Sequence, residues 1–311
     1  MSSPRHRRPR SGARRTTGRR SGGPRPRPRP SGATRARRRR GRRRVPPALL
    51  GWGAALVALA VVVVLGVRMA GDRTPASATG RCSVAGSELE LDGEQAASAA
   101  TIAAVARSRG LPERAVVIAL ATAQQESTLR NLDHGDRDSL GLFQQRPSQG
   151  WGSPEQVRDP VYAAGKFYDR LVEVPGWETG RLTEVSQSVQ RSGFPEAYQK
   201  HEPMAQTLTS ALLTGGLSCS WEPQEVGGRL SERTSAAAGR AERELGVSAS
   251  EEFGAVSLDP AAGWLGATWA VAHAEGLQVE SVAYAGRTWT PEGGWADSGA
   301  GAGAVRLELR A

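Results

Sequence analysis

Apolar side chains recur at helical spacing through the middle of the chain. Val116, Val117, Leu120 and Ala123 fall at i, i+1, i+4 and i+7, which predicts a helix with one buried stripe. Pro112 near its first turn favours a helix start at this point. The same reasoning predicts further helices over the ranges 94–109, 153–174 with a break at 159–160, 182–192 and 195–213. No convincing alternation of a strand interrupts this region, so we expect it to be all helical.

The pattern changes after a linker-like stretch at 221–230. Two helices are predicted over 233–246 and 263–277, and strands over 254–259, 281–290 and 304–310, with Gly-rich turns between them. We therefore expect a small α+β domain at the C-terminus, and a mainly α fold for the chain as a whole. The predicted divisions are the ranges 1–47, 48–68, 69–92, 93–220, 221–230 and 231–311.

A third apolar pattern is continuous rather than periodic. Residues 48–67 contain no charged side chain, and a helix of twenty residues spans a hydrocarbon core of roughly 30 Å. Three arginines precede this run directly, so the positive-inside rule predicts a transmembrane helix with a cytoplasmic N-terminus and an extracellular body. A long signal peptide cleaved near Ala78, which would release a secreted protein, is the alternative.

The charge is distributed very unevenly. Residues 1–44 hold 19 arginines and no acidic residue, which leaves 22 basic and 31 acidic side chains in the remainder. The tail has almost no apolar residues, so we expect it to be disordered. An arginine-rich tail permits a nucleic-acid partner, but membrane topology and attraction to anionic lipids explain it more simply.

The chain has only two cysteines, Cys82 and Cys219. An even number of cysteines in an oxidising compartment suggests a disulfide bond, and two separate thiols are the alternative. Two distant cysteines cannot form a zinc site.

A dense polar loop follows the helix that ends at Glu126. Asp133, His134, Asp136 and Asp138 resemble metal ligands, but their spacing does not match a calcium-binding EF-hand loop and no second histidine lies near. We expect neither a metal nor a cofactor. A glycosidase needs a carboxylic acid whose pKa is raised by an apolar setting, and Glu126 ends an apolar helix. A solvated glutamate at the end of a helix is the simpler reading of the same residues.

The motifs around this loop resemble a known superfamily. The Glu126-Ser127 pair, the segment 135–137 (Gly-Asp-Arg) and the segment 141–144 (Gly-Leu-Phe-Gln) are similar to those of soluble lytic transglycosylases and goose-type lysozymes. A later Asp-Pro…Gly…Tyr pattern at 159–168 is also similar. The resemblance covers roughly residues 94–215. It implies a lysozyme-like helical domain that cleaves the β-1,4 bond between N-acetylmuramic acid and N-acetylglucosamine in peptidoglycan.

The resemblance also implies roles for individual residues. Glu126 would be the catalytic acid, and Asp136 would position a water in a hydrolase. We expect the following residues to bind substrate: Ser127, Ser139, Gly141, Phe143, Gln144, Gln145, Trp151 and Tyr198. Segment 189–193 departs from the family, because the tyrosine that helps to hold the N-acetyl group is absent there; Tyr198 is a candidate replacement.

The C-terminal tryptophans allow two readings. Trp264, Trp269, Trp289 and Trp295 could stack on sugars, but packing in a core is the simpler expectation. A wall-binding or scaffold protein without turnover is therefore the alternative to a membrane-anchored enzyme.

Overall fold

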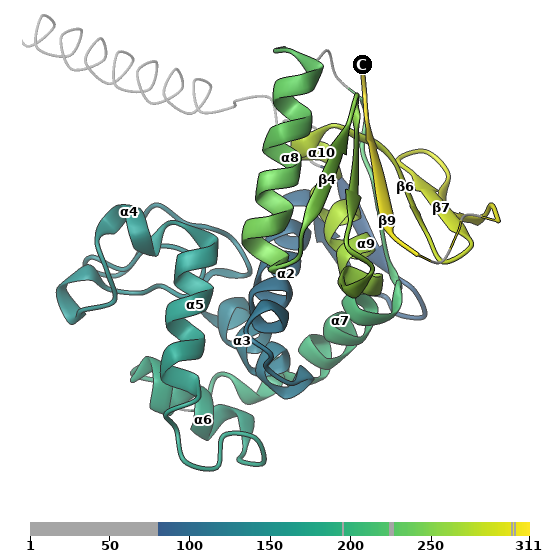
Figure 1. Ribbon diagram of the computed structural model, residues 1–311. Coiled ribbons are helices and arrows are strands. Elements are labelled where there is room, and N and C mark those ends of the chain that lie inside the picture. The colour runs from purple at the N-terminus through teal and green to yellow at the C-terminus, as the bar shows by residue number, and fades with distance from the viewer. Residues whose placement is uncertain (1–79, 195, 224–226, 300, 302) are drawn as a thin grey trace, which may run out of the picture. The chain divides into compact units, whose positions relative to one another are not determined.

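The computed structural model describes residues 80–311, apart from 195, 224–226, 300 and 302 (Figure 1). The predicted tail, the apolar run at 48–67 and the cleavage site near Ala78 all lie outside the described residues. In the part that is described, no helix is long and apolar enough to cross a bilayer. This finding contradicts the expected single-pass membrane protein, which rested on the apolar run at 48–67 and on the arginines before it.

A small antiparallel sheet joins the two ends of the helical region. Strand β1 (Arg81–Val84) lies between β2 (Glu90–Asp92) and β3 (Leu217–Ser220). Cys82 is the direct cross-strand partner of Cys219, and the two form a disulfide bond between positions 137 apart in sequence. The predicted disulfide is confirmed, and both of its cysteines are buried.

Helices α2 (Gly93–Ser108) and α3 (Glu113–Ser127) form the centre of the helical region. The Asp92 side chain accepts from the backbone N–H of Gln95 while the Gln95 side chain accepts from that of Asp92, so a capping box starts α2. All four residues of the predicted apolar stripe on α3 are buried.

The remaining helices of this region follow the predicted order. Asp159 accepts from the N–H of Tyr162 and Pro160 occupies the first turn, which explains the break that the sequence predicts there. The helices are α4 (Pro154–Val157), α5 (Pro160–Leu171), α6 (Leu182–Gln190) and α7 (Glu202–Thr214). In Figure 1, α4, α5 and α6 lie on the side of α3 that faces away from the large sheet.

The C-terminal part forms a larger antiparallel sheet with helices on it. The strands, in spatial order, are β4 (Ala249–Glu252), β5 (Ala255–Leu258), β9 (Val305–Leu309), β6 (Val279–Tyr284), β7 (Arg287–Thr290) and β8 (Gly294–Asp297). Helices α8 (Leu230–Leu245) and α9 (Gly263–Ala272) contact both this sheet and α2, and the short α10 (Ala274–Leu277) follows α9. The two helices therefore lie between the sheet and the helical region (Figure 1).

A buried polar cluster joins α2, α8 and α9. Glu244 Oε2 accepts from Thr101 Oγ1 and from Trp269 Nε1, both at 2.7 Å, and Glu244 Oε1 accepts from Arg240 Nε at 2.7 Å. His273 Nε2 lies 3.4 Å from Glu244 Oε2. Burial raises the Glu244 pKa, but these donors outweigh burial and the net pKa is well below the ordinary value. A single carboxylate thus binds groups from three helices.

The expected mainly α fold is wrong, because two antiparallel sheets accompany the helices in the described part of the chain. Strands of the small sheet have only three or four residues, and β1 pairs with β3 across the whole helical region. Local periodicity cannot reveal such pairing. The domain boundaries proposed from sequence stay a prediction.

The structure gives two of the C-terminal tryptophans a packing role. Trp269 and Trp289 are fully buried, so they cannot stack on an external sugar. Trp264 and Trp295 are partly buried and meet edge to face, with ring centroids 5.4 Å apart. Trp269 and Trp289 therefore pack in the core, as the simpler expectation had it.

Candidate functional site

Glu126 lies in the last turn of α3, where it faces a cavity of about 520 Å³. Its carboxylate Oε1 accepts a 2.6 Å hydrogen bond from the Tyr198 hydroxyl. Burial raises the pKa of Glu126, while hydrogen bonds from Tyr198 and the side chain of Gln190 oppose that increase only in part. The result is a partly buried carboxyl group that holds its proton to higher pH than a solvated glutamate does.

The chain reverses direction immediately after this glutamate. Thr128 and Leu129 both have positive φ, at 54° and 60°, although neither is glycine. Left-handed backbone costs such residues roughly 1–2 kcal/mol each, so the surrounding contacts must hold the turn. The Leu129 side chain is fully buried, which supplies one such contact.

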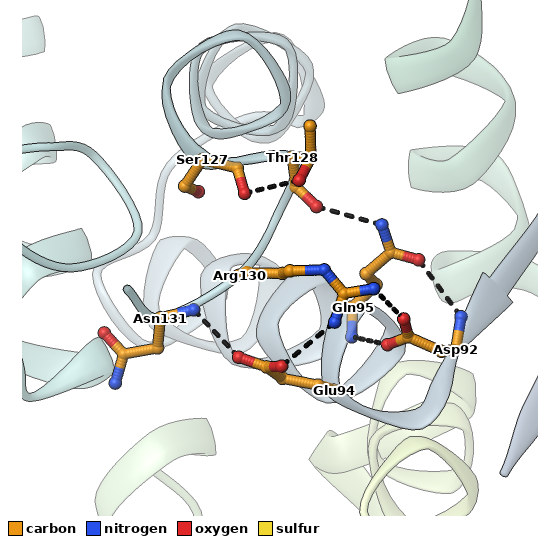
Figure 2. Close-up of polar contacts among 7 residues, drawn as sticks. All are labelled: Asp92, Glu94, Gln95, Ser127, Thr128, Arg130 and Asn131. Carbon is orange, nitrogen blue, oxygen red and sulfur yellow. Dashed lines mark hydrogen bonds and ion pairs between the residues drawn. The ribbon is translucent and has the colours of Figure 1, made fainter. Parts of the chain in front are cut away.

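Figure 2 shows the polar contacts that fix this turn to the start of α2. Gln95 Nε2 donates to the backbone carbonyl of Thr128 at 3.0 Å. The Arg130 guanidinium pairs with both Asp92 and Glu94, and Glu94 also accepts from the backbone N–H of Asn131 at 3.0 Å. The capping residues of α2 therefore position the backbone that follows Glu126.

A tight turn forms the floor of the polar loop. Leu140 and Gln145 exchange backbone hydrogen bonds of 3.0 Å and enclose the segment that resembles the family motif. Gly141 has φ of 76°, and a Cβ atom there would lie 2.2 Å from the carbonyl oxygen of Val157. Only glycine fits this position, so the glycine of the motif has a structural reason.

Several residues predicted to bind substrate instead hold the loop together. Ser127 Oγ donates to the Leu142 carbonyl at 2.8 Å, and Gln145 Nε2 donates to the Ala163 carbonyl at 3.0 Å. Phe143 is fully buried and stacks on Phe167 with ring centroids 4.7 Å apart. None of these three side chains, nor Gly141, lines the cavity.

Other predicted residues do line the cavity with Glu126. Ser139, Gln144 and Trp151 form parts of its wall, and Tyr198 reaches it through the hydrogen bond to Glu126. Asp136 lies at the cavity with its side chain 88% exposed. The structure therefore brings together one partly buried carboxyl group and one solvated carboxylate, which is the pair that glycosidase chemistry uses.

The end of α6 contributes wall residues that the sequence analysis did not select. Gln190 Nε2 donates to the Phe143 carbonyl at 2.7 Å, and the Gln190 side chain also reaches Glu126. Arg191, Ser192 and Gly193 continue the wall. The sequence contained a sign of their importance, because segment 189–193 is the part that departs from the family motif. Residues from the loop complete the lining: Arg137, Arg146 and Gln149.

Two acidic residues of the loop pair with donors from the same loop. Asp133 accepts from its neighbour His134, and Asp138 accepts from Arg146 Nε and from the backbone of Ser148. Hydrogen bonds from Ser148 and Arg146 hold the pKa of Asp138 well below its usual range. Across the residues that the structure describes, no group of three or more histidine, cysteine, aspartate and glutamate side chains could hold a metal ion.

Comparisons with known proteins assign neither a family nor a function to the chain. No protein-family model matches the chain, and no curated protein matches it. Function is therefore inferred from the cavity and its residues.

Proposed function

We propose that this protein cleaves the glycan strands of peptidoglycan, with Glu126 as the general acid. The observation that carries the proposal is the environment of Glu126: a carboxyl group with a raised pKa at the wall of a cavity, fixed by the hydroxyl of Tyr198. A general acid must hold its proton near the working pH, and burial achieves this for a carboxyl group.

The proposed reaction begins with transfer of the Glu126 proton to the glycosidic oxygen. The bond between that oxygen and C1 breaks, and positive charge develops on the sugar ring. The Tyr198 hydroxyl and the Gln190 amide then stabilise the Glu126 carboxylate that the transfer creates, because both donate to it more strongly when it is charged.

Two routes complete the reaction. In a lytic transglycosylase the C6 hydroxyl of the same sugar attacks C1 and gives its proton to Glu126, so the product is a 1,6-anhydro sugar. In a muramidase, Asp136 positions a water that attacks C1 and gives one proton to the Asp136 carboxylate, and the product is a reducing sugar. The solvated position of Asp136 at the cavity supports its candidacy for the second route.

The sequence and the disulfide add support. The Glu-Ser and Gly-Leu-Phe-Gln motifs contact each other through the hydrogen bond from Ser127 to the Leu142 carbonyl, and one residue of each motif, Glu126 and Gln144, lines the cavity. The disulfide between Cys82 and Cys219 is typical of proteins in oxidising environments, where peptidoglycan is also found.

Release of soluble fragments from insoluble peptidoglycan tests the proposal. The full-length protein should release them, and Glu126→Gln should reduce the rate by at least ~10²-fold, since glutamine keeps the shape but cannot donate the same proton. Glu113→Gln, at the opposite and exposed end of the same helix, is the matched control and should remain active. A wall-binding protein without turnover would instead adsorb to peptidoglycan and release nothing.

A further inference from the structure

A second hollow continues from the cavity that contains Glu126. It has a volume of about 420 Å³, and its lining includes Arg170 on α5 and Ser188 near the end of α6. Gln149 and Arg191 line both hollows. A ligand in the Glu126 cavity can therefore extend directly into this neighbouring groove.

The groove contains two arginines with no carboxylate partner. Neither Arg170 nor Arg191 forms an ion pair within 4.0 Å in the described part of the chain, whereas Arg137 and Arg146 of the neighbouring cavity both do. Burial lowers the pKa of Arg170, and repulsion by the positive charge of Arg191 lowers it further. Glu173 also lines the groove and offsets part of this charge from a distance.

Arg170 is held in place by an aromatic ring, and Arg191 by its backbone alone. The Arg170 guanidinium lies 3.4 Å from the centre of the Trp151 ring, so the indole fixes its plane and leaves its edge free. Arg191 ends α6 in a left-handed conformation with φ of 54°, and its side chain is exposed. An anion that entered the groove would meet two guanidinium groups that form no ion pair with the carboxylates of the described residues.

We infer that the groove formed by Arg170, Arg191 and Gln149 binds a carboxylate of the peptide that is attached to the glycan. This inference rests on the proposed function, because peptidoglycan carries short peptides with free carboxylates on its muramic acid residues. The enzyme would then prefer peptide-bearing strands to strands from which the peptides have been removed.

The chemistry of the groove lining supports a peptide rather than a further sugar. Glycan-binding walls usually offer aromatic faces and neutral amides, whereas the polar groups of this hollow are two guanidinium groups, one carboxylate, one amide and one hydroxyl. The nearby ring of Trp151 is already covered by Arg170 on one face. A carboxylate can accept from both guanidinium groups at once.

Binding measurements in the full-length Glu126→Gln protein separate this inference from the function on which it rests. The probes are a disaccharide of N-acetylglucosamine and N-acetylmuramic acid with its peptide, the same compound with the peptide carboxylates amidated, and the disaccharide alone. The acidic compound should bind at least about tenfold more tightly than either of the others, as expected for a lost charge-assisted hydrogen bond.

Substitution of Arg191 tests the groove itself. Arg191→Asn removes the charge while keeping a residue that tolerates positive φ, so it should abolish the preference for the acidic compound. Arg181→Asn removes a charge from the other end of α6, where Arg181 pairs with Glu184 and Glu196, and should leave the preference unchanged. Unfolding temperatures of both variants establish that each is folded.

Each alternative result has a distinct meaning. Equal binding of all three saccharides would overturn the groove inference and leave the proposed function standing. Failure of every saccharide to bind would overturn both. In a third outcome, millimolar inorganic phosphate displaces the acidic compound fully, and the amidated compound binds as tightly as the acidic one. This outcome would assign the groove to a phosphate group and overturn the carboxylate assignment.

Discussion

Replacement of Tyr198 by phenylalanine tests how the protein sets the proton affinity of Glu126. The substitution removes one hydroxyl, whose 2.6 Å hydrogen bond to Glu126 Oε1 favours the charged carboxylate. Hydrogen bonds to charged groups contribute about 1.5–3 kcal/mol, so loss of this one should shift the protonation equilibrium of Glu126 toward the acid by up to about ten- to hundredfold. Burial remains, because the phenylalanine ring fills the same volume.

The pH dependence of kcat/KM measures this change. A general acid must be protonated in the free enzyme, so the rate falls as the pH rises through the Glu126 pKa. In Tyr198→Phe that basic limb should move to higher pH. Titration of the Glu126 side-chain carbon by NMR reports the same change and does not depend on turnover.

Tyr168→Phe is the matched control. The Tyr168 hydroxyl is also buried and donates to the Ile102 carbonyl at 3.0 Å, away from Glu126. This variant should lose stability while its pH profile and the Glu126 titration stay as in the wild type. An unchanged basic limb in Tyr198→Phe, or an equal shift in the control, would refute the assignment of Tyr198 as the group that tunes Glu126.

Three further predictions concern stability. Gly141→Ala should lower the free energy of unfolding by more than about 1–2 kcal/mol in urea titrations, because it combines positive φ with a backbone clash; full stability would contradict the geometry of the turn. Loss of the disulfide in the Cys82→Ser, Cys219→Ser double variant should cost up to about 5 kcal/mol, measured as a lower unfolding temperature than that of the oxidised wild type. Glu244→Gln should cost about 1.5–3 kcal/mol at pH 7. The pKa of Glu244 is lower in the folded protein than its ordinary value of 4.5. The difference in unfolding free energy between wild type and variant should therefore be fully present above pH 4.5 and shrink as the pH falls toward the folded pKa. A difference that stays constant with pH would contradict the assignment of Glu244 as a buried carboxylate.

Local sequence signals predicted the helices of the central region well. The apolar stripe of α3 and the Asp159-Pro160 break both appear in the structure, because they depend on contacts within a few residues. The small sheet was not predicted. Strand β1 has four residues in a Gly/Ser/Ala-rich stretch and is paired only by a partner far along the chain, so neither composition nor periodicity identifies it.

The candidate site shows the same division between local and distant information. The position of Glu126 at the end of an apolar helix is local, and the sequence identified it. The roles of Gln190 and Tyr198 depend on how α6 and the segment after it pack against α3, which lies more than sixty positions earlier for both. Phe143 and Gln145 were assigned to substrate because polar and aromatic loop residues resemble a sugar-binding wall, but the closed turn directs both side chains inward.

Mass analysis of the chain ends produced from purified peptidoglycan shows whether Glu126 acts in glycan cleavage. The wild-type protein should make new muramic acid ends, either 1,6-anhydro or reducing, and Glu126→Gln should make neither. Asp136→Asn then separates the routes, since it should suppress a reducing product but leave an anhydro product unchanged. Fragments that arise from peptide bonds alone, or undiminished glycan cleavage by Glu126→Gln, would contradict the claim that Glu126 donates a proton to a glycosidic oxygen.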